Sequence, residues 1–93
     1  MILHLIQSSP EQSSALKTCL RYARQSDSIL LTGNSVNCLL KQAWATQLKE
    51  YNVAALQEDV IARGLTSLLK DTKQINYDEF VSLSLKFNKV ISW

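Results

Sequence analysis

The chain has 93 residues, of which 46% are apolar, and a domain of this length builds one hydrophobic core but not two. Its 10 Lys and Arg residues are spread along the chain against 8 Asp and Glu residues, which excludes a dedicated basic clamp for nucleic acid. The N-terminus lacks the pattern of a signal peptide, and no apolar run approaches the roughly 20 residues that span a bilayer, so we expect one cytoplasmic domain, residues 1–93, without membrane contact.

The first predicted unit is a strand followed by a helix. Residues 2–6 form a short apolar run that is typical of a buried strand. Ser9 is placed to cap a helix, Pro10 suits the first helical position, and Gln12 stands where a capping box has its Glu or Gln. We therefore expect a helix that begins at Pro10 and whose apolar face repeats at Ala15, Leu16, Cys19, Leu20 and Ala23.

A second strand and helix follow. Residues 28–32 read as a buried strand that ends at the turn 33–35. Beyond this turn, apolar residues at helical spacing predict one helix that runs toward Leu48. The turn lacks the glycine-rich motifs that hold nucleotide phosphates, so it does not indicate a nucleotide site.

The C-terminal half adds three more strands in prediction. Residues 53–56 read as the third strand, and residues 58–63 as a short helix with acidic residues at its positive end. Gly64 is expected to stop that helix in a left-handed conformation. The remaining segments read as a brief fourth strand (74–76), a helix (77–87) and a fifth strand (90–93).

The alternation of strands and helices predicts an α/β fold. Each parallel crossover returns right-handedly over the sheet, so we expect a mostly parallel sheet of about five strands with helices on both faces. A flavodoxin-like fold or a close variant of it meets this description. In such folds the loops at the carboxyl ends of the strands form the usual ligand crevice.

The residues 56–65, Leu-Gln-Glu-Asp-Val-Ile-Ala-Arg-Gly-Leu, resemble the signature segment of the TusB/DsrH family. The resemblance is supported by Leu3-His4 followed by Ser9-Pro10, by the segment 75–83 and by the terminal Trp93, and it covers essentially the whole chain. It implies the DsrE/DsrF/DsrH-like variant of the fold. It also implies a subunit of a heteromeric sulfur relay complex with homologous C and D subunits, which passes persulfide sulfur for 2-thiolation of the tRNA wobble uridine.

The resemblance further implies that this subunit does not itself carry sulfur. The sulfur-carrying cysteine of the D-type relatives corresponds, by this resemblance, to the segment Leu56-Gln57-Glu58 of this chain. This chain has no cysteine in that segment. Negative charge at Glu58 and Asp59 disfavours a thiolate nearby. We therefore expect no enzyme activity of the chain alone, no cofactor, and tRNA as a partner only indirectly, through the pathway.

Cys19 carries the alternative, a direct persulfide acceptor. Its segment resembles the cysteine-containing helix of DsrH proteins of sulfur oxidation. Its place on the apolar stripe of the first helix favours packing instead, because free cysteine is among the most buried residue types. Cys38 reads as core or surface filler, and His4, the single histidine, as a hydrogen-bonded core residue. The cysteine and histidine spacing predicts neither a metal site nor a disulfide.

The candidates for a partner interface are Glu58, Asp59, Arg63 and Trp93. Arg63 suits contact with a phosphate or with a partner carboxylate, although an arginine in the last turn is also what the helix dipole favours. The aromatic residues Trp44, Tyr77, Phe80 and Trp93 read as core, with some of them expected to face a partner.

Overall fold

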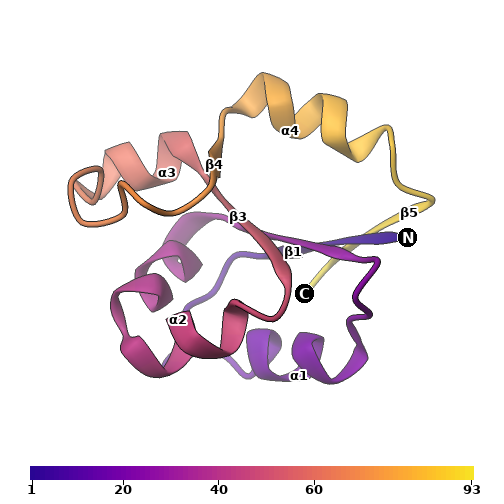
Figure 1. The fold of residues 1–93 in the computed structure, drawn as a ribbon, viewed down its shortest axis with the longest axis horizontal. Helices are drawn as coiled ribbons and strands as arrows, with labels where there is room; N and C mark the ends of the chain where they lie inside the picture. Colours follow the sequence, from indigo (N-terminus) through magenta and orange to yellow (C-terminus); the bar gives the residue numbers. More distant parts are fainter.

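The computed structural model describes all residues, 1–93, and contains one sheet of five strands (Figure 1). Every strand pairs in parallel with its neighbours, in the order β4-β3-β2-β1-β5. The predicted α/β class is confirmed, and the strand order identifies a variant of the flavodoxin arrangement, whose order is 2-1-3-4-5. The strands are β1 (Ile2–Ile6), β2 (Ser28–Leu31), β3 (Asn52–Leu56), β4 (Gln74–Ile75) and β5 (Lys89–Ser92).

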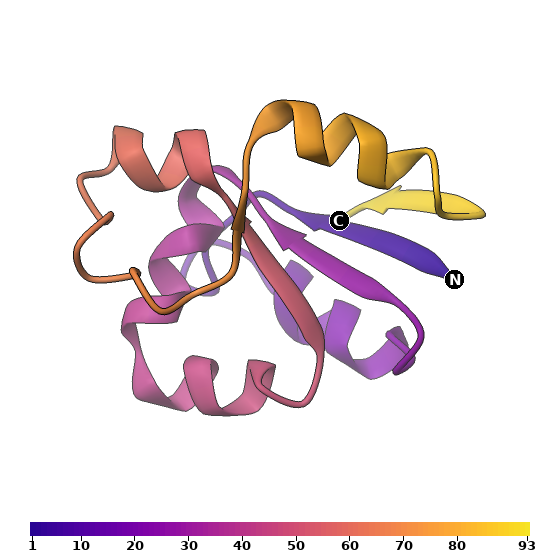
Figure 2. The same cartoon turned by 45° about the horizontal axis from the view of Figure 1, so that its top comes forward.

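Helices cover both faces of the sheet, as predicted. They are α1 (Ala15–Tyr22), the 3₁₀ helix η1 (Gly33–Leu40), α2 (Gln42–Leu48), α3 (Gln57–Ala62) and α4 (Tyr77–Ser84). Figures 1 and 2 show α4 on the opposite side of the sheet from α1 and α2. No helix has the length and apolar character needed to cross a membrane.

Two hydrophobic clusters hold these layers together. The larger cluster joins one face of β1, β2 and β3 to α1, η1, α2, α3 and the turn after α3. The smaller cluster buries Leu3, Leu30, Ala54 and Ile75, and α4 and the turn after it contribute only partly buried residues to it. The α4 face is therefore the less completely covered side of a sheet whose parallel strands normally require cover on both faces.

Helix α1 begins at Ala15, so the predicted start at Pro10 is wrong. The residues after Ser9 form a turn in which the Ser9 carbonyl accepts from the backbone N–H groups of Gln12 and Ser13. The Gln12 side chain does accept from Ser9, as a capping box requires. The turn does not continue as a helix because the Ser13 hydroxyl accepts from the N–H of Ala15, and such local contacts compete with the helical ladder.

The single helix predicted after residue 35 is divided in two. Helix η1 ends at Leu40, and Lys41 has the extended angles φ −98° and ψ 124° before α2 begins at Gln42. Polar side chains in η1 bond to nearby backbone: the Ser35 hydroxyl reaches the Thr32 carbonyl and the Asn37 amide reaches the Asn34 carbonyl. Such side-chain bonds offer the backbone an alternative to the α-helical pattern.

Candidate functional site

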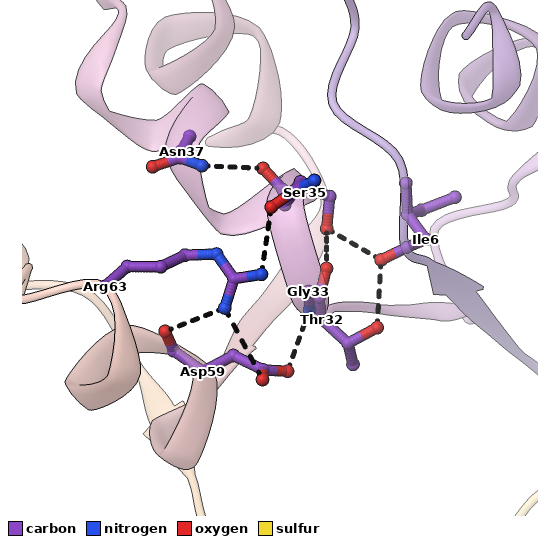
Figure 3. A network of polar contacts seen from close by, with 8 residues as sticks. Ile6, Thr32, Gly33, Ser35, Asn37, Asp59 and Arg63 are labelled. Atoms are coloured by element: carbon purple, nitrogen blue, oxygen red, sulfur yellow. Dashed lines mark hydrogen bonds and ion pairs between the residues drawn. The ribbon is translucent and has the colours of Figure 1, made fainter. Parts of the chain in front are cut away.

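Polar residues from three elements meet at the carboxyl ends of β1, β2 and β3. Since all strands are parallel, the turn after β2 and the start of α3 lie at the same edge of the sheet, as Figure 3 shows. The centre of this edge is a contact between Gly33 and Asp59, which lie 26 residues apart in the chain. We refer to Gly33, Asn34, Asp59 and Arg63 as the carboxyl-edge network.

Asp59 fixes the turn after β2. Its Oδ2 atom accepts from the backbone N–H of Gly33 at 2.8 Å. Gly33 has φ +54°, and a Cβ atom at this position would stand 3.2 Å from the Gln7 carbonyl oxygen. Glycine is required here both by the left-handed backbone and by the close approach of the chain after β1. The carboxylate thus holds a turn that only glycine forms without strain.

Arg63 completes the network from the end of α3. Its Nη2 group donates to Asn34 Oδ1 at 2.9 Å, and its Nη1 group donates to the Asp59 carbonyl at 3.3 Å. Nη1 also lies 3.6 Å from Asp59 Oδ1, and the side chains of both residues are 28% exposed. These contacts use two of the five N–H donors of the guanidinium, so the rest remain able to meet a partner.

The ends of β1 and β2 are tied together beneath the network. The fully buried Ser35 hydroxyl lies 2.6 Å from the Ile6 carbonyl oxygen and 2.7 Å from that of Thr32, so its single proton is shared between two acceptors. Thr32 donates to Ile6 through its backbone and its hydroxyl. The roles of Ser35 and Asn34 were missed by the sequence reasoning, although the Gly33-Asn34-Ser35 turn marked the place.

A cavity of about 480 Å³ opens beside the network and is lined by Leu5, Gln7, Thr32, Gly33, Asn34, Leu56, Asp59, Arg63 and Phe80. Its polar groups are a carboxylate paired with a guanidinium, amides and a hydroxyl, with no thiol among them. Nowhere in the chain do three or more His, Cys, Asp or Glu side chains gather to hold a metal ion. The arrangement suits recognition through hydrogen bonds.

The other two interface candidates lie outside this network. Glu58, exposed on the first turn of α3, accepts from the backbone N–H of Tyr77 at 3.1 Å and so joins α3 to the start of α4. Trp93 lies on the α1 side of the sheet, where it packs beside His4 and Tyr22.

Gly64 follows α3 with φ +66°, which confirms the predicted left-handed stop.

His4 is a buried structural histidine, as predicted. Its side chain bridges two elements: Trp93 Nε1 donates to Nδ1 at 3.0 Å, which leaves Nε2–H to donate to Asp27 Oδ2 at 3.0 Å. Burial raises the pKa of Asp27, but hydrogen bonds from His4 and from the backbone N–H groups of Arg24 and Ile2 outweigh it, and the net pKa lies below its usual value. No nucleophile completes a catalytic triad in this group.

Both thiols are sealed in the larger cluster. Cys19 is 0% exposed in the second half of α1, and Cys38 is 2% exposed in η1. Burial, with a smaller effect of the Asp27 charge, raises the pKa of Cys19 to about 11. Burial, with a smaller effect of Glu11, likewise raises the pKa of Cys38 to about 11. Neither sulfur has the thiolate character of a reactive cysteine.

The chain is similar to known proteins over nearly its whole length. The profile of the family described as DsrH like protein matches residues 8–90. Proteins named TusB from Yersinia pestis and Yersinia pseudotuberculosis are each 34% identical over 96 aligned positions, which cover 99% of this chain and 100% of each relative.

Two solved structures share the fold. A Thermotoga maritima protein, determined by solution NMR, is 27% identical with a TM-score of 0.70 and covers 92% of this chain and 93% of its own. A conserved protein of unknown function from Bacteroides thetaiotaomicron has a TM-score of 0.73 over 99% of this chain and 94% of its own, at 16% identity. The second likeness concerns the fold alone.

Proposed function

The chain belongs to the DsrH-like protein family, and from this membership we propose that it is a non-catalytic subunit of a heteromeric sulfur relay complex. In the proposed complex, homologous C and D subunits accompany it, and persulfide sulfur passes toward the wobble uridine of tRNA for 2-thiolation. The family and the names of the relatives support a sulfur relay role in general. We propose a cytoplasmic location, with tRNA involved only through the pathway.

The observation that carries the non-catalytic role is the lack of a usable thiol. A persulfide carrier needs a thiolate that another thiolate can reach. At the start of α3, where the resemblance places the cysteine of the sulfur-carrying D-type relatives, this chain has Leu56, Gln57 and Glu58. The two cysteines that the chain does have are buried, with the pKa of each raised to about 11. These features support a subunit that positions the relay without holding sulfur.

The carboxyl-edge network is the surface we propose for partner contact, together with Glu58. Asp59 and Arg63 hold each other and the β2 turn in a fixed shape, which reduces the conformational entropy lost on binding. The guanidinium keeps free donors for a partner carboxylate. Trp93 remains a separate candidate on the α1 side of the sheet.

Co-purification tests this proposal. The tagged chain, expressed with its C and D homologues, is expected to retain both. Arg63→Ala should lower the affinity for the partners by about tenfold, the effect of one charged hydrogen bond, while the folding stability changes by less than about 1 kcal/mol because the intramolecular pair is partly exposed. Arg21→Ala, at an exposed position on α1, serves as the control. Capture of neither homologue by the unaltered chain would contradict the proposal.

A further inference from the structure

A buried hydrogen-bonded group joins His4, Asp27 and Trp93 on the α1 side of the sheet. His4 is 2% exposed and Asp27 is 5% exposed. The neutral imidazole uses both of its nitrogens, since Nδ1 accepts from the Trp93 indole N–H and Nε2–H donates to the Asp27 carboxylate, each at 3.0 Å. The hydrogen bonds of this group therefore require one particular charge state of His4, the neutral one.

A charged His4 is incompatible with the Trp93 contact. A protonated imidazole carries a hydrogen on each nitrogen and has no acceptor left. The indole of Trp93 is a donor only, so two N–H groups would face each other across the 3.0 Å between His4 Nδ1 and Trp93 Nε1. The Asp27 carboxylate still accepts from Nε2–H and is attracted by the charge. Protonation thus keeps one of the two hydrogen bonds and removes the other.

Trp93 is the side chain that can move. His4 lies on β1, between β2 and β5, and is held by Asp27. Trp93 follows the edge strand β5, and its ring stacks on Tyr22, which is 68% exposed. A cavity of about 560 Å³ is lined in part by His4, Tyr22 and Trp93, so the indole has room to turn away and water can reach Nδ1–H. The Trp93 backbone N–H donates to the Leu5 carbonyl and keeps the main chain in place.

The charges around His4 act in both directions. Asp27 favours the charged imidazole, whereas the nearby cationic groups and burial oppose it. The pKa of Asp27 lies below its usual value, and burial raises the pKa of Cys19 to about 11, so the carboxyl stays ionised and the thiol stays neutral near neutral pH. The titratable and charged groups on this side are the Met1 amine at the start of β1, Cys19 and Tyr22 on α1, Arg24 and Asp27 before β2, and Lys89 on the same face of β5 as Ile91.

We propose that His4 is a pH-sensitive switch for Trp93. The neutral imidazole holds the indole against the sheet, and the charged imidazole releases it together with its stack on Tyr22. Histidine is the side chain that normally changes charge between about pH 5 and pH 8, so the indole is held at the upper end of this range and free at the lower end. The switch needs no other protein, so its test on the chain alone can fail without affecting the sulfur relay proposal.

Nuclear magnetic resonance of the isotope-labelled chain between about pH 8 and pH 5 tests the switch. Proton–nitrogen correlation spectra follow the charge of His4, the single histidine, and the indole N–H of Trp93 in the same samples. Trp44→Phe identifies which of the two indole signals belongs to Trp93. As His4 becomes charged, exchange of the Trp93 indole N–H with water, corrected for its intrinsic pH dependence, should become about tenfold faster, which is the effect of one lost hydrogen bond.

His4→Gln is the matched control, because glutamine offers one acceptor and one donor but does not titrate. In this variant the corrected exchange of the Trp93 indole N–H should stay constant over the same range. Far-UV circular dichroism verifies that the variant is folded, and the titration of the unaltered chain decides if it is not. The proposal is overturned if His4 becomes charged without faster Trp93 exchange, if His4 stays neutral over the whole range, or if the folded His4→Gln variant shows the same acceleration.

Discussion

Gly64 illustrates how one residue sets the position of the candidate interface. Its φ of +66° is in the left-handed region, and no atom lies within 4 Å of the place where a Cβ would stand. Any penalty for a side chain therefore comes from the backbone conformation and not from a clash. The glycine ends α3 directly after Arg63 and so determines where the guanidinium lies.

Gly64→Val should lower the free energy of unfolding by about 1–2 kcal/mol, because a β-branched residue is forced to positive φ. Each kcal/mol corresponds to a fall in Tm of about 4–8 °C in a domain of this size. Gly64→Asn is the matched control and should cost less, because asparagine tolerates the left-handed region. Thermal unfolding followed by circular dichroism checks both, and equal losses for valine and asparagine would contradict the backbone explanation.

Asp27 gives the stability of the chain a pH dependence with a defined sign. The pKa of this buried carboxyl is lower in the folded chain than in the unfolded one, where it is about 3.9. Its contribution to stability is therefore complete above about pH 4 and is lost as the pH falls below that value toward the folded pKa. His4, Ile2 and Arg24 supply the hydrogen bonds that are then lost.

Asp27→Asn should cost about 1–3 kcal/mol at pH 7, because buried N–H donors lose their acceptor. Below pH 4 the difference from the unaltered chain should shrink, since the unfolded chain then takes up a proton at Asp27 that the folded chain binds only at a lower pH. Urea unfolding between about pH 3 and pH 7 measures this difference. A constant difference across that range would contradict the assignment of the acid-sensitive stability to Asp27.

At the scale of elements, the strands were predictable and several helix boundaries were not. Continuous apolar runs located β1 and β2 to within a residue, because strands of a parallel sheet are buried on both faces. The start of α1 and the division between η1 and α2 depend on hydrogen bonds of Ser13, Ser35 and Asn37, whose side chains choose among several backbone partners. The spacing of apolar residues in the sequence does not indicate which backbone group these side chains bind.

Only the residues that α3 contributes to the candidate site could be predicted from the sequence. Asp59 and Arg63 were marked by their place in the segment 56–65. Their partners Gly33 and Asn34 come from a turn 26 and 29 residues away, and that pairing depends on the parallel order of β2 and β3. Tyr77, one of the four aromatic residues read as core with some of them expected to face a partner, is 58% exposed.

The start of α4 depends on a complete capping box. Asn76 Oδ1 accepts from the N–H of Glu79 at 2.8 Å, and the Glu79 carboxylate accepts from the N–H of Asn76 at 3.0 Å. Asn76→Ala should lower the free energy of unfolding by about 1 kcal/mol, whereas Asn76→Asp should preserve it because aspartate is an equally good cap. Urea unfolding measures both, and a loss as large for aspartate as for alanine would contradict the capping role.

At the scale of the whole molecule, the proposed partner surface and the two thiols lie in different parts of the fold. The carboxyl-edge network with Glu58 is the proposed contact with homologous subunits, whereas Cys19 and Cys38 are buried in the core. This separation agrees with the proposed role of a subunit that does not itself hold sulfur.

The 2-thiouridine content of tRNA tests the central claim most directly, in a strain that lacks this gene and is complemented with a chain carrying Cys19→Ala and Cys38→Ala. Each substitution removes a buried sulfur at a cost on the order of 1 kcal/mol, so immunoblotting must first show that the variant accumulates. We expect the deletion to lose wobble-uridine thiolation and the cysteine-free chain to restore it as fully as the unaltered chain. Normal 2-thiouridine in the deletion strain, or no restoration by an accumulated cysteine-free chain, would contradict the account.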